Sequence, residues 1–174
     1  MDWTDRLLDR WATLRPDLGM EAYQVTARLG RIAQHVARHQ EETFARFDLN
    51  RGEVGVLSAL RTAGPPNRLS PTSLFKGLML SSAGMTSRLD RLEQRGFVRR
   101  TPDPSDRRGV LVELTDSGRG VLEEAVGANT ASERELLQSL SHGEQEDLAR
   151  LLKKLLAGLE PVAGDTTGSG EDEG

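Results

Sequence analysis

One run of turn residues, 102–109, constrains the fold of this 174-residue chain more than any other segment. It reads Pro-Asp-Pro-Ser-Asp-Arg-Arg-Gly, and short segments with apolar residues flank it at 97–100 and 110–114. Two such segments joined by turn residues predict a β-hairpin with 102–109 as its loop. The other periodic segments have helical spacing, so we expect a mostly α fold of the α+β kind.

Helical periodicity and capping signals predict seven helices around this hairpin. They cover about 4–14, 20–47, 51–63, 82–95 and 116–139, with a short helix from Ser70-Pro71 and a last helix after Ser141. Asn50 with Glu53 and Ser141 with Glu144 are capping boxes. Gly96 is placed to end the helix at 82–95.

These elements divide the chain into four predicted parts. They are N-terminal helices at 1–48, a lobe at 49–115, C-terminal helices at 116–160 and an acidic tail at 161–174. From Gly164 onward the tail contains only glycine, threonine, serine and acidic residues, so we expect it to be disordered.

The distribution of charge matters more than the net charge of −4. Residues 160–174 carry five acidic and no basic side chains, so the remaining residues sum to +1. The segment 88–108 contains seven arginines and four acidic residues. A basic patch on a nearly neutral body favours an anionic partner such as DNA.

Several classes of protein are excluded by composition. The absence of cysteine excludes disulfides, thiolate zinc sites and a catalytic thiol. No run of 18 apolar residues is present, and the acidic start lacks the order of a signal peptide, so we expect a cytoplasmic protein without a membrane span. The serines lack a Gly-x-Ser-x-Gly motif and no phosphate-binding glycine loop occurs, so we expect no enzyme activity and no cofactor.

His35 and His39 lie four residues apart, a spacing that can hold a metal ion. No third ligand is evident from the sequence. A solvated or pH-responsive histidine pair is therefore the favoured interpretation, and we expect no metal site.

Three helices followed by a basic hairpin over 51–114 are the pattern of a winged helix-turn-helix. In that fold the helix at 82–95 enters the major groove of DNA and the hairpin reaches a neighbouring groove. The predicted DNA contacts on this helix are its polar and guanidinium side chains: Ser82, Thr86, Ser87 and Arg91. The alternative is an ordinary amphipathic surface helix followed by a solvated turn.

The same region resembles the multiple antibiotic resistance regulator (MarR) family. The resemblance lies in Leu-Ser-Pro-Thr-Ser-Leu at 69–74, in Ser-Ser-Ala-Gly-Met-Thr-Ser-Arg-Leu-Asp-Arg-Leu-Glu-Gln-Arg-Gly-Phe-Val-Arg-Arg at 81–100, and in Asp-Pro-Ser-Asp-Arg-Arg-Gly-Val-Leu-Val-Glu-Leu-Thr at 103–115. It implies an obligate homodimer with interleaved terminal helices, bound to an inverted-repeat operator in double-stranded DNA. It further implies a repressor that a small ligand releases.

The resemblance also assigns roles within the hairpin. In the family, an Asp-x-Arg arrangement positions an arginine for the minor groove, here Asp106 with Arg108, and the neighbouring carboxylate would restrict the arginine rotamers. Arg107, Arg99 and Arg100 are expected to contact phosphates. The alternative for Asp106 and Arg108 is a surface ion pair of little energetic value.

A leucine stripe in the last helix independently predicts dimerisation. The stripe consists of Leu148, Leu151, Leu152, Leu155 and Leu159, together with Leu156. The alternative is a helix packed within its own chain, which would leave the terminal helices little to pack against.

The segment around Trp11 resembles the urate-responsive, PecS-like branch of the family. That resemblance implies a purine anion held between Trp11 and Arg88, since an indole stacks on a flat ring and a guanidinium pairs with its charge. The branch also uses an aspartate where this chain has Gly55, although Glu53 is close in sequence. We therefore expect a small, flat or anionic effector, the alternative being that Trp11 only anchors its helix.

Two other functions fit parts of this pattern. One is a ligand-blind or architectural DNA-binding protein, and the other is a helical dimerisation module that never binds DNA.

Overall fold

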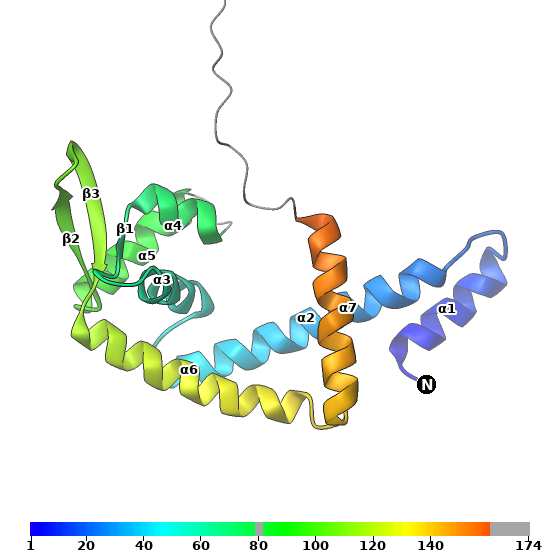
Figure 1. The fold of residues 1–174 in the computed structure, drawn as a ribbon. Helices are drawn as coiled ribbons and strands as arrows, with labels where there is room; N and C mark the ends of the chain where they lie inside the picture. The colour runs from blue at the N-terminus through cyan, green and yellow to red at the C-terminus, as the bar shows by residue number, and fades with distance from the viewer. Residues whose placement is uncertain (79–81, 161–174) are drawn as a thin grey trace, which may run out of the picture. The chain divides into compact units, whose positions relative to one another are not determined.

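The computed structural model describes residues 1–78 and 82–160, apart from the side chains of 75–78, 82, 83 and 107. The predicted acidic tail, 161–174, therefore lies outside the described residues. The elements in chain order are α1 (Trp3–Leu14), α2 (Glu21–Ala45), α3 (Arg51–Thr62), β1 (Arg68–Leu69), α4 (Pro71–Leu78), α5 (Ser82–Gln94), β2 (Val98–Asp103), β3 (Asp106–Leu114), α6 (Asp116–Leu136) and α7 (His142–Leu159) (Figure 1). The prediction of a mostly α winged helix is confirmed.

The hairpin is longer than predicted. Strands β2 and β3 pair antiparallel from Val98↔Leu114 to Asp103↔Asp106, so the turn is confined to Pro104 and Ser105 and the predicted loop at 102–109 is wrong. Pro102 is tolerated in the ladder because β2 is an edge strand, where a missing N–H costs little.

Strand β1 was not predicted. Its two residues pair with β3 at Arg68↔Glu113 and Leu69↔Val112, which gives a three-stranded sheet in the order β1-β3-β2. Two residues carry no detectable periodicity, and their pairing depends on a strand more than 40 residues away along the chain.

The long helix α2 ends earlier than the predicted residue 47. Asp48 has a φ of +55°, and the Leu49 N–H donates to the Phe44 carbonyl at 3.1 Å, so the chain leaves the helix in a left-handed turn. Helix α6 likewise ends at Leu136 rather than at 139.

The predicted caps are confirmed. Asn50 and Glu53 exchange both hydrogen bonds of a capping box, each at 3.0 Å, at the start of α3. At the end of α5, Gly96 has a φ of +72°, its N–H donates to the Glu93 carbonyl, and the Phe97 N–H donates to the Leu92 carbonyl, both at 2.9 Å. This pair of bonds is a Schellman motif, which requires a residue that adopts positive φ.

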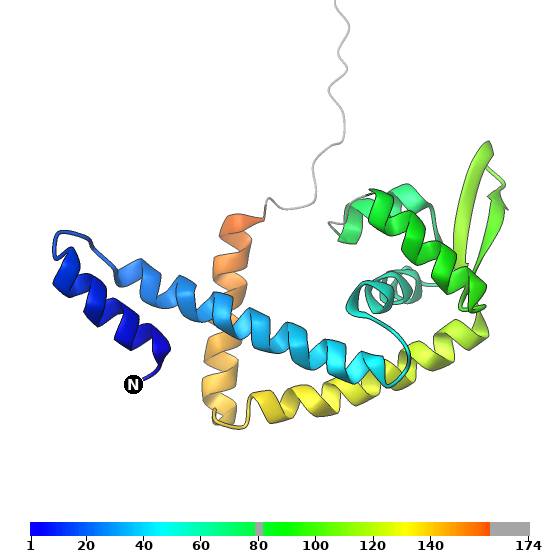
Figure 2. The same cartoon turned by 180° about the vertical axis from the view of Figure 1, so that it is seen from behind.

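The hydrophobic core is concentrated in the lobe that contains α3, α4, α5 and the sheet, which Figures 1 and 2 show gathered together. Its fully buried side chains include Val56, Leu57, Leu60, Leu74, Leu92 and Val112. Phe44 of α2 and Leu122 of α6 join the same cluster. The lobe is thus held to the end of one long helix and the start of another.

Helix α1 is attached to the N-terminal half of α2 by charged contacts. The Arg28 guanidinium donates to Asp2 at 2.8 Å and also to Asp5. Arg31 lies over the Trp3 ring at 4.8 Å from its centroid.

The contacts of the chain divide it into two compact units, residues 1–133 and the residues from 134 onward. Within the second unit, the Gln145 side chain donates to the Leu140 carbonyl at 2.9 Å, and Ser141 with Glu144 caps α7. None of the helices within 1–78 and 82–160 is both long and apolar enough to cross a lipid bilayer.

Candidate nucleic-acid interface

Helix α5 has one buried side and one exposed side. Met85, Leu89 and Leu92 are buried in the lobe. Thr86 and Ser87 are exposed, as the major-groove prediction requires. Ser82 begins α5, but its side chain lies outside the described residues. The helix therefore presents short polar groups opposite its apolar stripe.

Two arginines of α5, and a third directly after its end, lie on the side of the helix that faces the start of α3. They are Arg88, Arg91 and Arg95, which fall close together at about 100° of rotation per residue. The Arg91 Nε pairs with Glu53 at 3.0 Å. Arg95 donates to the main-chain carbonyls of Phe47 and Asp48.

Arg88 packs against Gly52 of α3. A Cβ at residue 52 would lie 2.2 Å from the Arg88 Nε, so a larger residue there would require the Arg88 side chain to move. The Nε is buried and has no hydrogen-bond partner among the described residues. A buried donor without a partner is unusual and marks a place where an acceptor would stabilise the structure.

A cleft of about 480 Å³ lies beside these arginines. It separates the end of α2 and the first turn of α3 from α5, and Asp48, Glu53, Arg91 and Arg95 line it. Charges of both signs line this cleft, and neither Trp11 nor Arg88 is among its lining residues.

The structure does not bring Trp11 and Arg88 together within one chain. Helix α1 contacts the N-terminal half of α2 through Arg28, whereas the lobe is joined to Phe44, which lies roughly 24 Å further along that helix. No hydrogen bond, ion pair or ring contact joins the two side chains among the described residues. The pairing of Trp11 with Arg88 in one ligand site stays a prediction.

The tip of the hairpin is shaped by two aspartates. The Asp103 carboxylate accepts the Ser105 N–H at 2.8 Å and its hydroxyl at 2.6 Å, and these bonds hold the pKa of Asp103 below its usual value. Asp106 accepts the main-chain N–H of Arg108 at 2.9 Å. The carboxylate of Asp106 therefore orders the main chain of the hairpin at Arg108, and its effect on the Arg108 rotamers stays a prediction. Arg108 is exposed, and the side chain of Arg107 lies outside the described residues.

The two arginines of β2 are both engaged in ion pairs. Arg99 donates to Glu113 at 2.7 Å, and this hydrogen bond lowers the pKa of the Glu113 carboxyl. Arg100 donates to Asp90 at 2.6 Å and also to Glu93, both on α5. Arg100 therefore ties the hairpin to the helix, and any phosphate contact would compete with these carboxylates.

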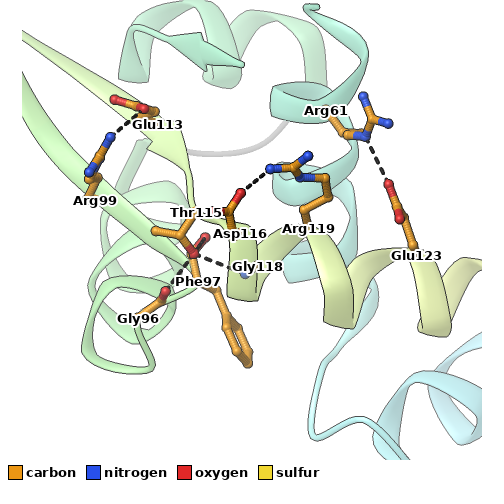
Figure 3. Close-up of polar contacts among 10 residues, drawn as sticks. All are labelled: Arg61, Gly96, Phe97, Arg99, Glu113, Thr115, Asp116, Gly118, Arg119 and Glu123. Carbon is orange, nitrogen blue, oxygen red and sulfur yellow. Dashed lines mark hydrogen bonds and ion pairs between the residues drawn. The ribbon is translucent and has the colours of Figure 1, made fainter. Parts of the chain in front are cut away.

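The hairpin also joins α6 through a compact polar junction (Figure 3). The Thr115 hydroxyl donates to the Gly96 carbonyl at 2.7 Å and accepts the Gly118 N–H at 3.0 Å, which caps α6. A Cβ at Gly118 would lie 2.0 Å from the Phe97 carbonyl oxygen. The start of α6 therefore lies directly against the backbone that follows α5.

The predicted dimerisation leucines are exposed. Leu151, Leu152, Leu155 and Leu159 are 39–72% exposed, and Leu148 is half-buried. Helix α7 contains no buried residue. This apolar surface is available for a partner.

The histidine pair is split by the fold. His39 hydrogen-bonds the Ser132 hydroxyl of α6, whereas His35 is exposed. In the part of the chain that the structure describes, no group of three His, Asp or Glu side chains is placed to hold a metal ion.

Sequence reasoning missed the double role of Glu53. The Asn50-x-x-Glu53 spacing predicted only a helix cap, and the pairing with Arg91 depends on the packing of α3 against α5. The signal for this pairing is the burial of the Glu53 carboxylate, which requires a charged partner and is seen only once the fold is known.

Comparisons with known proteins agree with this geometry. Residues 49–110 match the model of the MarR family. The chain is 35% identical over 149 residues to the HTH-type transcriptional regulator PecS of Dickeya dadantii, covering 86% of this chain and 90% of that protein.

Two solved structures are also similar. Sco3205 of Streptomyces coelicolor, a MarR family regulator in complex with DNA, matches with a TM-score of 0.72 and 27% identity, covering 83% of this chain and 95% of that one. BpsR of Bordetella bronchiseptica, whose DNA binding is regulated by 6-hydroxynicotinic acid, matches with a TM-score of 0.66 and 29% identity, covering 76% and 98%.

These relatives are regulators rather than enzymes, and they favour DNA binding over a helical module that never contacts DNA. The lobe contains three helices and a β-hairpin, the elements of a winged helix-turn-helix. The chain belongs to the MarR family of DNA-binding transcription regulators.

Proposed function

We propose that this regulator is a homodimeric repressor that binds an inverted-repeat operator and is released by a small aromatic or anionic ligand. The exposed leucine stripe of α7 carries the dimer part of this proposal. A helix with several exposed leucines is poorly tolerated in a monomer, because contiguous apolar surface favours association.

Two lobes related by a two-fold axis would read two half-sites. In that arrangement α5 contacts the major groove through Thr86, Ser87 and Arg91, with Ser82 at its start. Arg108 at the exposed tip of the hairpin enters the minor groove, and Arg99, Arg100 and Arg107 lie close to phosphates.

A salt titration tests the DNA contacts. The logarithm of the association constant should fall linearly with the logarithm of salt concentration, with a slope of about −0.9 per neutralised phosphate. A flat dependence on salt, for random duplex and operator alike, would contradict a DNA-binding function.

The unpartnered Nε of Arg88 supports the effector part of the proposal. An anion bound there would satisfy a buried donor on the helix that reads DNA, and its binding would shift that helix. Trp11 can complete this site only from a second chain, and otherwise serves to anchor α1.

The effector is tested by titrating urate, xanthine, salicylate and 6-hydroxynicotinic acid against the complex with operator DNA. Release of DNA by at least one of them, lost in Arg88→Ala, is the expected result. Trp11→Phe should weaken that response if Trp11 contributes to the site. An Arg88→Ala variant that responds as strongly as the wild type would remove Arg88 from the proposal.

A further inference from the structure

Glu53 is an acidic side chain almost fully removed from water. The residue is 4% exposed, in the first turn of α3. Each of its two carboxylate oxygens has a separate partner: Oε2 accepts the Asn50 N–H, and Oε1 pairs with the Arg91 Nε, both at 3.0 Å. The carboxylate thus links the first turn of α3 to the last turn of α5.

The capping role alone does not require a charge. Glutamine at this position of a capping box accepts the same main-chain N–H. A buried negative charge is costly unless a cation compensates it, and Arg91 supplies that cation. The feature that distinguishes glutamate from glutamine here is therefore the contact with Arg91.

The Arg91 side chain is paired at its Nε and is exposed to solvent. Its Nε forms an ion pair with Glu53, yet its side chain is 52% exposed. The four N–H donors on the two terminal amino groups of the guanidinium lie beyond Nε and are not part of this pair. Arg95, one turn further along the same side, donates to main-chain carbonyls, pairs with the exposed Asp48 carboxylate at 3.2 Å and is less exposed than Arg91.

We propose that Glu53 is a positioning residue for DNA binding: it holds Arg91 through Nε and orients the terminal amino groups of Arg91 toward a DNA phosphate at the edge of the major groove that α5 enters. This inference rests on the proposed role of Arg91 at the DNA. An arginine ordered before binding loses less conformational entropy when it contacts phosphate, and so binds more tightly.

The positioning role and simple electrostatics predict opposite results. A carboxylate near DNA repels phosphate, so charge alone predicts that Glu53→Gln binds operator more tightly. Positioning predicts weaker binding, by about 5-fold, because Arg91 is no longer oriented. Glutamine keeps the cap, so helix α3 is retained in this variant.

A double-mutant cycle on operator affinity separates a role through Arg91 from a general structural role. In an Arg91→Ala background, Glu53→Gln should change the dissociation constant less than 2-fold. Arg91→Lys, which keeps the charge but cannot offer separate Nε and amino donors, should weaken binding as Glu53→Gln does. Glu123→Gln, which removes a carboxylate from the exposed pair with Arg61, serves as the matched control and should have no effect.

The salt dependence gives a second measurement. Arg91→Ala should reduce the slope of log affinity against log salt by about one phosphate contact. The positioning role is wrong if Glu53→Gln binds as tightly as the wild type or more tightly, or if it weakens the Arg91→Ala protein equally. If the wild-type protein itself fails to bind duplex DNA, the proposed function fails instead.

Discussion

The lobe at 49–115 and helix α7 obtain their stability in different ways. In the lobe, α3, α4, α5 and the sheet bury a shared set of apolar side chains, several of them completely. In α7 no residue is buried, although the helix carries as regular a leucine pattern as any in the chain. The lobe is stabilised by its own contacts, whereas α7 requires a surface beyond its own helix.

This difference shows that helical periodicity alone does not identify what a helix packs against. Full burial of a leucine contributes about 1.5–3 kcal/mol, so four leucines left 39–72% exposed represent a large unrealised stabilisation. We infer that a second copy of the chain covers this surface.

The largest expected effect follows from placing charges in the leucine stripe. Leu152→Glu combined with Leu155→Glu should abolish dimerisation, because two carboxylates would be desolvated at the interface. Operator affinity should then fall by more than about 100-fold, since each lobe alone reads one half-site. Sedimentation and electrophoretic mobility shifts measure the two effects.

Ala157→Glu is the control for this experiment. It adds a carboxylate to the opposite side of α7, at about 140° from Leu152, and should leave the dimer intact. A stripe double mutant that remains dimeric would contradict the assignment of α7 to the interface.

Substitution in the lobe core should destabilise the protein without depending on association. Leu57 is 0% exposed, and Leu57→Ala should lower the free energy of unfolding by about 2–5 kcal/mol. Leu151→Ala should instead make the melting temperature more dependent on protein concentration. Thermal unfolding at several protein concentrations distinguishes the two variants. If their melting temperatures depend on protein concentration to the same extent, the proposed difference between the lobe and α7 is wrong.

Substitutions of the two hairpin arginines should have DNA-binding effects that differ in kind and in magnitude. Arg108→Ala should weaken operator binding about 10-fold and relax preference at the flanks of the site. Arg99→Ala should weaken all sequences alike and less strongly, because Glu113 already engages this side chain. Affinity for operator and scrambled duplexes measures both, and equal loss of specificity in the two variants would refute the division of roles.

The smallest effect concerns the turn after α5. Gly96→Ala should cost about 1 kcal/mol, because alanine resists the φ of +72° at this position. Gly120→Ala, in α6 with open space around it, should stabilise the protein slightly. A neutral Gly96→Ala would show that the Schellman turn is not required.

Much of the fold was predictable because its signals are local. The Asn50–Glu53 and Ser141–Glu144 capping boxes and the Gly96 turn each depend on a few adjacent residues, and all were confirmed. The missed features depend on distant pairing: β1 forms only against β3, and the predicted loop at 102–109 is mostly part of the β2–β3 ladder.

The same distinction between local signals and contacts of distant residues applies to the candidate site. The exposure of Thr86 and Ser87 agrees with the helical pattern of α5. The pairing of Glu53 with Arg91, the packing of Arg88 on Gly52 and the separation of Trp11 from Arg88 are tertiary consequences that no local pattern encodes.

Footprinting of the operator is the most direct test of two-fold symmetric DNA binding. Genomic fragments that the protein retains are selected, and the protected bases are mapped on both strands. A two-fold symmetric dimer should protect an inverted repeat whose half-site centres lie about one helical turn, ~10 bp, apart. A single asymmetric protected site would contradict the two-fold arrangement.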